Sequence, residues 1–252
     1  MKLVNEHRAV PARLITPTDN GFLLIGADIG AWAGPFPLPA RSRRRLLAEA
    51  GPLCAALARR DDVLEATVFR AVLRPPGEGR KLLQRAQVSP ARYDVVVLIR
   101  TRSVADLVAL RADTAWLELA ALLKTQARQV HQIAARNPAR IADVDHDPRH
   151  WFLFNYFFCK DPGTLRDVWE YTAGWFQRET ALPDSVPMQP LPGEPDDYNL
   201  VNHASWPTLR SFLPSLLFRP SFRNFVLANF AANDIAAQPI IYRMHLSGDV
   251  AT

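Results

Sequence analysis

The chain has 252 residues, of which 48% are hydrophobic and 22% charged, so it can bury the core of one large domain or of two ordinary ones. Its longest apolar run is far shorter than the roughly 18 residues that a membrane span needs, and its first residues lack the apolar stretch of a signal peptide. The net charge of +5 comes mainly from dispersed arginines, which argues against a nucleic-acid stripe. We expect a globular cytoplasmic protein with neither membrane nor nucleic acid among its partners.

The two cysteines, Cys54 and Cys159, both fall at apolar positions of predicted elements. This placement is typical of reduced core thiols, and it favours them over a disulfide or a metal pair.

The first half of the chain predicts the element order β-α-β-β-α-β. Apolar runs with strand character and helical spacing of apolar residues define the elements. The expected strands are Phe22–Ile29, Leu64–Leu73, Tyr93–Ile99 and Val130–Ile141, and the expected helices are Arg41–Arg60 and Val104–Lys124. Gly51-Pro52 predicts a kink or a split in the first helix. The charged segment Glu78–Arg92 predicts an exposed loop.

The second half repeats that order, starting from the aromatic stretch HWFLFNYFFCK at His150–Lys160. This stretch predicts a strand buried on both faces. The expected strands are Trp151–Cys159, Ser185–Leu191, Tyr198–Ser205 and Ile240–Met244, and the expected helices are Thr164–Ala181 and Leu209–Ala231. Prolines confine the strand at Ser185–Leu191 to an edge or a bulge. Pro214 and Pro220 should interrupt the last helix.

A β-α-β-β-α-β unit is the ferredoxin-like arrangement, whose sheet has helices on one face and leaves the other face to be covered. The expected fold is therefore α+β, with two tandem ferredoxin-like repeats, residues 1–142 and 143–252, packed sheet to sheet. When Tyr93 is placed on Tyr198 without gaps, apolar positions match between the halves. In this alignment His203 falls on Leu98, and when Phe22–Ile25 is placed on Trp151–Phe154, Asn155 falls on Gly26, so the first half lacks these polar groups.

The stretches WFLFNYFFCKDPGTLRDVWEYTAGWF and YNLVNHASWPTLRSFLPSLLFRPSFRNFV resemble the dimeric α+β barrel superfamily, and within it the antibiotic-biosynthesis monooxygenase-like domains. The resemblance implies an intramolecular version of the barrel that two chains usually form. It covers residues 148–246 more fully than residues 20–142. Members include cofactor-independent oxygenases acting on aromatic polyketides, haem-degrading oxygenases and small isomerases, and a fold alone does not decide among them.

Asn155 and His203 are the candidate catalytic residues. A buried amide must find a partner or cost roughly 1–3 kcal/mol, and a histidine can act as a general base near neutral pH. Strand alternation sends Asn202 and His203 to opposite faces. We expect a pocket between the second sheet and its helices, with Trp169, Tyr156, Asn202, Trp206 and Phe222 as substrate-binding residues. The competing interpretation is that these polar groups are satisfied in a closed core.

Haem and metal are not expected. In haem-degrading relatives an asparagine on the first strand serves the site, as Asn155 could here, and a histidine on the last helix binds the iron. The corresponding stretch RPSFRNF carries Phe222 near that place. The stretch Asp143–His150 (DVDHDPRH) is rich in metal-binding residue types, but it lacks a second ligand cluster and reads as a solvated linker between the repeats.

Two functions remain open from the sequence. One is a cofactor-independent oxygenase or isomerase that acts on a planar apolar small molecule. The other is a non-catalytic barrel that binds a hydrophobic ligand or a partner protein, with a haem-binding protein less favoured than either. A homodimer is also left open.

Overall fold

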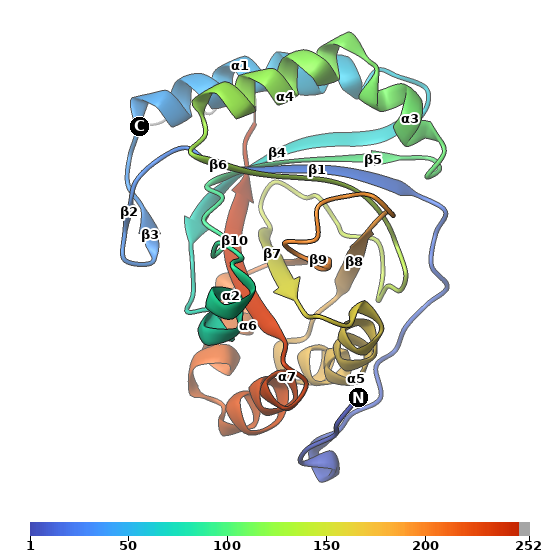
Figure 1. Ribbon diagram of the computed structural model, residues 1–252, viewed down its shortest axis with the longest axis vertical. Coiled ribbons are helices and arrows are strands. Elements are labelled where there is room, and N and C mark those ends of the chain that lie inside the picture. Colours follow the sequence, from blue (N-terminus) through green and yellow to red (C-terminus); the bar gives the residue numbers. More distant parts are fainter. Residues whose placement is uncertain (247–252) are drawn as a thin grey trace.

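Eight strands, four from each half of the chain, close into one antiparallel barrel in the computed structural model, which describes residues 1–246 (Figure 1). In chain order they are β1 (Gly21–Asp28), β4 (Val63–Leu73), β5 (Val95–Thr101), β6 (Gln129–Arg136), β7 (Trp151–Phe158), β8 (Asp184–Pro190), β9 (Leu200–Trp206) and β10 (Ala236–Met244). Around the barrel the order is β1-β5-β4-β10-β7-β9-β8-β6.

Each half contributes a ferredoxin-like sheet. The strands of the first half lie in the order β6-β1-β5-β4 and those of the second in the order β10-β7-β9-β8, which is the same order of fourth, first, third and second strand. The two sheets join along β4–β10 and, through only Ala135↔Pro190 and Arg136↔Gln189, along β6–β8. The predicted tandem ferredoxin-like fold is confirmed, and β8 lies at the edge of its own sheet as its prolines predict.

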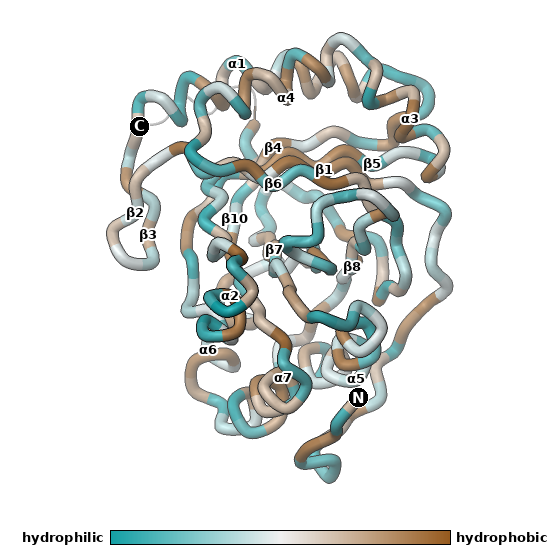
Figure 2. Tube along the Cα trace, viewed as in Figure 1, coloured by the Kyte–Doolittle hydropathy of each residue, from teal (hydrophilic) through white to brown (hydrophobic). Residues whose placement is uncertain are grey.

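The strands are buried on both faces because the barrel has an apolar interior and an apolar outer layer. All eight residues of β1 are buried, and in β7 only Trp151 and Asn155 are partly exposed. Figure 2 shows the resulting hydrophobic strands beneath the helices. Alternate residues of one strand therefore serve two different cores, as the two-residue period of a strand requires.

Helices cover the outside of the barrel in two groups (Figure 1). The first half carries α1 (Arg41–Leu57), α3 (Asp106–Arg111) and α4 (Thr114–Gln126), and the second carries α5 (Pro162–Thr180), α6 (Leu209–Phe218), a π-helix (Phe222–Leu227) and α7 (Ala228–Ala232). Asp161 caps α5 by accepting a hydrogen bond from the Gly163 amide, and Pro162 takes the first turn, where its missing N–H costs nothing. None of the helices within residues 1–246 is long and apolar enough to cross a membrane.

Two local expectations need correction. Pro52 lies within α1 without splitting it, and Pro214 lies within α6, so the last helix breaks at Arg219-Pro220. The residues before α1 contain a small hairpin from β2 (Trp32–Ala33) and β3 (Phe36–Pro37).

The segment Glu78–Arg92 is not simply an exposed loop. It contains α2 (Arg80–Ala86), which buries Leu83, and the following residues Val88 and Ala91 are buried as well. These three side chains join the core inside the barrel. Charged and apolar residues are equally frequent in this segment, and its apolar residues pack into or against the inner core.

The N-terminal segment, residues 1–14, crosses to the helices of the second half, where the N-terminus lies near α5 and α7 (Figure 1). A 3₁₀ turn at Glu6–Arg8 is its only helix. Three side-chain amides each exchange two hydrogen bonds with one backbone residue of this segment: Asn233 with Lys2, Asn229 with Val4, and Gln177 with Arg13. These side-chain amides thus bond to the backbone of residues 1–14 as a neighbouring strand would, and they attach this segment to the second half.

Replacing Gly174 on α5 should loosen this segment. A Cβ there would lie 1.9 Å from the carbonyl oxygen of Val10, so Gly174→Ala must displace the backbone of residues 1–14. We expect a loss of about 1–3 kcal/mol in the free energy of unfolding, measured by urea denaturation. The control is Gly163→Ala in the first turn of the same helix, where the nearest atom to a Cβ is Asp161 Oδ1 at 3.3 Å. Equal stability of the two variants would contradict this packing.

His131 on β6 lies inside the barrel, is 2% exposed, and has no hydrogen-bond partner for either ring nitrogen among residues 1–246. It packs among Tyr93, Tyr156 and Tyr198. Burial lowers the pKa of His131 to about 4, because the charged imidazolium would lose its hydration.

The stability of the protein should therefore fall on acidification. The unfolded chain takes up the His131 proton near pH 6.5 and the folded chain only near pH 4, so stability is present above the unfolded pKa and is lost as the pH falls. Between pH 7.5 and pH 5, protonation of His131 in the unfolded chain should lower the free energy of unfolding by about 2 kcal/mol. Urea denaturation at the two pH values measures this loss of stability. In His131→Phe the loss should be smaller by that amount. An unchanged pH dependence would show that His131 is already protonated or solvated.

Candidate functional site

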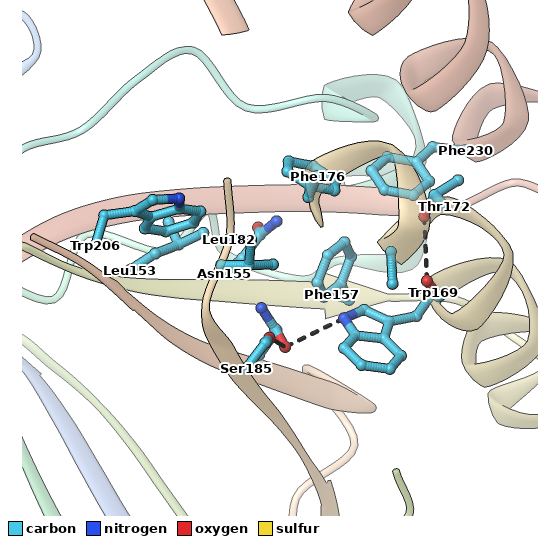
Figure 3. A pocket seen from close by; sticks show the side chains of 12 residues that line it. Leu153, Asn155, Phe157, Trp169, Thr172, Phe176, Leu182, Ser185, Trp206 and Phe230 are labelled. Carbon is cyan, nitrogen blue, oxygen red and sulfur yellow. Dashed lines mark hydrogen bonds between the residues drawn. The ribbon is translucent and has the colours of Figure 1, made fainter. Parts of the chain in front are cut away.

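A cavity of about 30 Å³ lies between the second-half sheet and helices α5 and α7, in the place that the sequence predicts (Figure 3). Four of the predicted residues line it: Asn155, Asn202, Trp169 and Trp206. The complete lining is Leu153, Asn155, Phe157, Trp169, Thr172, Ala173, Phe176, Leu182, Ser185, Asn202, Trp206 and Phe230. The wall is thus apolar with a few polar groups, which is the usual composition of a ligand site.

The two asparagines of this cavity differ in how they are satisfied. The Oδ1 of Asn202 accepts hydrogen bonds from Trp169 Nε1 at 3.1 Å and from Ser185 Oγ at 2.8 Å, which fix the orientation of the amide (Figure 3). The Oδ1 of Asn155 is buried and has no hydrogen-bond partner within residues 1–246. An unpaired buried acceptor costs roughly 1–3 kcal/mol, so Asn155 is a polar group in need of a partner.

Asn155 and His203 do not belong to one site, although we expected them to act together. In the register of β7 and β9, Asn155 faces Asn202 while His203 faces Phe154. Phe154 and Tyr156 belong to the core inside the barrel, whereas the neighbours of Asn155 pack under the helices. The alternation that separates Asn202 from His203 also places His203 and Tyr156 on the opposite side of the sheet from the cavity.

Phe222 does not line the cavity either. It lies at the start of the π-helix and packs against Trp175 and Phe176. Trp206, in contrast, stacks on Phe212 at 4.4 Å and donates through Nε1 to the Thr180 carbonyl. Phe222 thus packs against α5 and is not part of the cavity wall, where we expected it to bind substrate.

Inside the barrel His203 belongs to a hydrogen-bonded chain of three side chains. His203 Nε2 lies 2.8 Å from His146 Nε2, and His146 Nδ1 lies 2.8 Å from Glu65 Oε2. Glu65 is also ion-paired with Arg100, at 3.1 Å. Glu65 comes from β4, His146 from the linker and His203 from β9, so both halves of the chain build this cluster.

The hydrogen-bond partners of the ring nitrogens indicate which of them carry protons. His203 Nδ1 lies 3.2 Å from the Leu153 carbonyl oxygen, which can only accept, so Nδ1 carries a proton. The Nε2 of neutral His203 is then an acceptor, and His146 Nε2 donates to it. His146 Nδ1 lies within hydrogen-bond distance of the Glu65 carboxylate.

Burial and neighbouring charge act in the same direction on the pKa of His203 and in opposite directions on the pKa of Glu65. Burial lowers the pKa of His203 well below its ordinary value, and the nearby His146 lowers it further. Burial by itself raises the pKa of Glu65, but the hydrogen bond and charge of His146 and the charge of Arg100 outweigh burial and hold that pKa below its ordinary value. We conclude that His203 is uncharged at neutral pH while Glu65 is ionised.

Nothing in the sequence indicates that Glu65 and Arg100 belong to this cluster, or that His146 contacts Glu65 and His203. The stretch Asp143–His150 was expected to be a solvated linker, but the side chain of His146 is only 10% exposed and contacts Phe69 and His203. No spacing signal links residues 65, 146 and 203, because the three meet only when the barrel closes.

The cavity under α5 does not fit haem. None of its lining residues within the described chain is a histidine, cysteine, methionine or tyrosine, the side chains that bind haem iron. The stretch RPSFRNF places Phe222 in the π-helix with no such ligand beside the cavity.

Substitutions of the two cavity asparagines should have opposite effects on stability. Asn202→Ala leaves the Trp169 indole N–H and the Ser185 hydroxyl without their acceptor, which should cost about 2 kcal/mol or more. Asn155→Leu removes an unpaired acceptor from a position of similar volume and should be neutral or stabilising by up to about 1 kcal/mol. Thermal and urea denaturation measure both. A large loss in Asn155→Leu would mean that its amide is satisfied and structural.

Comparison with known proteins supports the fold. No protein-family model matches the chain, and no match is found among curated proteins. Among solved structures, an anthrone oxidase-like protein superposes with a TM-score of 0.65 at 10% identity over 95% of this chain and 98% of that chain. A protein from Fusobacterium nucleatum named as a candidate monooxygenase gives a TM-score of 0.55 at 7% identity, over 90% and 93% of the two chains. A candidate chlorite dismutase gives 0.50 at 11% identity, over 92% and 97%.

These likenesses extend over nearly the whole length of both chains at identities that show the fold alone. Together with the closed eight-stranded barrel, they identify the architecture. The chain has the dimeric α+β barrel fold, with both ferredoxin-like halves carried by a single polypeptide.

Proposed function

We propose that the chain binds a planar, largely apolar small molecule in the cavity under α5, and that it oxidises this molecule with dioxygen without a cofactor. The observation that carries the proposal is the unpaired, buried Oδ1 of Asn155, which lies in an apolar cavity beside the fixed amide of Asn202. A ligand hydroxyl can donate to Asn155. The amide groups can also orient a substrate oxygen on which charge develops.

The polar groups of the cavity limit the chemistry. Its lining contains two amides, two hydroxyls and two indoles but no titratable side chain, so general acid–base catalysis by the wall is not available. Oxidation of a ring methylene to a carbonyl by dioxygen forms one carbonyl and one water, and the substrate supplies all four electrons. The name of the anthrone oxidase-like neighbour is consistent with this class of substrate, since an anthrone is a tricyclic ketone with such a methylene.

The cavity must enlarge for this substrate to enter. Its 30 Å³ has room for one or two water molecules, whereas ligand pockets usually measure about 300–1,000 Å³. The covering layer can move, because the last helix breaks at Arg219-Pro220 and continues as a π-helix, a feature that often marks functional sites. Trp175 on α5 donates to Ser221 at this break, so the two elements would move together.

The small cavity and the lack of titratable groups favour a second function, a non-catalytic barrel that stores or carries the same kind of ligand. Both functions need the same binding site, and they differ in the consumption of dioxygen. Whether the protein forms a homodimer stays a prediction.

Binding of a planar tricyclic ketone should depend on Asn155. We expect 2-hydroxyanthraquinone, whose hydroxyl can donate to Asn155 Oδ1, to quench the fluorescence of Trp169 and Trp206, and Asn155→Leu to weaken this binding roughly tenfold, the loss of one hydrogen bond. Tyr156→Phe is the matched control, since Tyr156 is the next residue of β7 and faces the barrel interior. It should bind as the wild type does.

An oxygen electrode with anthrone as substrate separates the two functions. Oxygen uptake above the uncatalysed rate, reduced in Asn155→Leu, supports the oxygenase, and binding without uptake supports the carrier. Equal binding by the two variants, or no binding by the wild type, would refute the site.

A further inference from the structure

His146 and His203 face each other inside the barrel with their Nε2 atoms 2.8 Å apart. Each ring is held from behind through Nδ1, His146 by the Glu65 carboxylate at 2.8 Å and His203 by the Leu153 carbonyl at 3.2 Å. Proteins fix metal-binding imidazoles in this way, by giving the second ring nitrogen a carboxylate or a backbone carbonyl. Both supporting contacts of a metal site are thus present, and the two ligand atoms converge.

We propose that His146 and His203 form a two-coordinate site for a soft monovalent metal ion, namely Cu(I). The ion replaces the proton that the two Nε2 atoms share. One proton is released to solvent for each ion bound, and neither metal nor protein changes its oxidation state.

The charges around the pair favour a monovalent ion. Arg100 is ion-paired with both Glu65 and Asp143, at 3.1 and 3.2 Å, and Arg140 is paired with Asp143. Two carboxylates and two guanidinium groups cancel, so no net negative charge is left to neutralise a divalent ion. Exchanging one proton for one monovalent ion leaves the charge of the cluster unchanged, while a divalent ion would add an unpaired buried charge.

The number of ligands points to the same ion. Among residues 1–246, histidine, cysteine, aspartate and glutamate form no group of three or more that could hold a metal, which argues against a four-coordinate zinc site. Cu(I) accepts two imidazole nitrogens in a linear arrangement. The thioether of Met188 lines the small cavity next to both rings and is a soft group of the kind that suits Cu(I).

The surroundings would protect the bound ion. His203 is 2% exposed, stacks on Phe154 at 4.1 Å between ring centroids, and meets the edge of Phe69. Phe152 packs against both histidine rings. This aromatic shell excludes water, and it makes the uncharged imidazole, the form that binds metals, the stable form of His203.

Metal binding requires a small movement. Two nitrogens on opposite sides of a metal ion lie about 4 Å apart, since each bond is roughly 2 Å, so the pair must open by about 1 Å. His203 is held in β9, but His146 lies in the loop between β6 and β7. The cavity of about 10 Å³ beside the two rings leaves room for the shift. The expectation of no metal at Asp143–His150 rested on a missing second ligand, and the fold supplies that ligand as His203.

The test is an anaerobic titration of the full chain with Cu(I) in competition with bicinchoninate. We use a Cys54→Ala, Cys159→Ala background, because the two buried thiols are the other soft ligands. One Cu(I) should bind per chain. His146→Ala should lower the affinity by about 100-fold and Glu65→Gln by roughly tenfold, whereas His150→Ala, a histidine of the same loop, should leave it unchanged.

His203→Ala should act as His146→Ala does, but His203 is a core residue. The loop variant His146→Ala therefore carries the test if His203→Ala fails to fold. X-ray absorption should show two nitrogen neighbours, and the affinity should rise about tenfold for each pH unit over which the shared proton is still bound. No binding in competition with the chelator, affinity unaffected by His146→Ala, or no pH dependence would show that the histidines form a hydrogen-bonded pair and nothing more.

Discussion

The structure depends on the pairing of two sheet edges, β4 with β10 and β6 with β8. Each ferredoxin-like sheet has helices on one face and leaves an apolar face open, and that face is stable only when the other half covers it. Edge pairing closes the barrel and removes the exposed edges at the same time. The cost of an apolar open face thus explains why the two halves occur as one closed unit.

Closure creates two chemically different compartments on the two faces of the second sheet. The outer face, under α5 and α7, holds amides, hydroxyls and indoles around a small cavity. The inner face holds imidazole, carboxylate and guanidinium groups from both halves. Adjacent residues such as Asn202 and His203 therefore serve unrelated sites, because a strand alternates its side chains between its faces.

The two halves share an architecture but have diverged in their polar groups. In the first half α1 and α4 cover the sheet with an almost entirely apolar core. In the second half the corresponding space contains Asn155 and Asn202, and the helix layer is broken and fastened by residues 1–14. A polar group in a sheet interior costs stability unless it is hydrogen-bonded, and this asymmetry between the halves is one reason why we propose the binding site in the second half.

The sequence by itself determined the order of the main elements and the tandem ferredoxin-like repeats, because apolar periodicity and proline punctuation are local signals. The closed barrel was expected from the resemblance to the dimeric α+β barrel superfamily. It also located the cavity of Asn155, Asn202, Trp169 and Trp206, since these residues share the outer face of two paired strands or the helix above. Only the tertiary structure decided that His203 and Tyr156 lie on the other face from Asn155, that Phe222 leaves the cavity, and that Glu78–Arg92 holds a helix. Only it brought Glu65 and His146 to His203, because contacts between residues far apart in the chain arise from closure of the barrel and leave no periodic trace in the sequence.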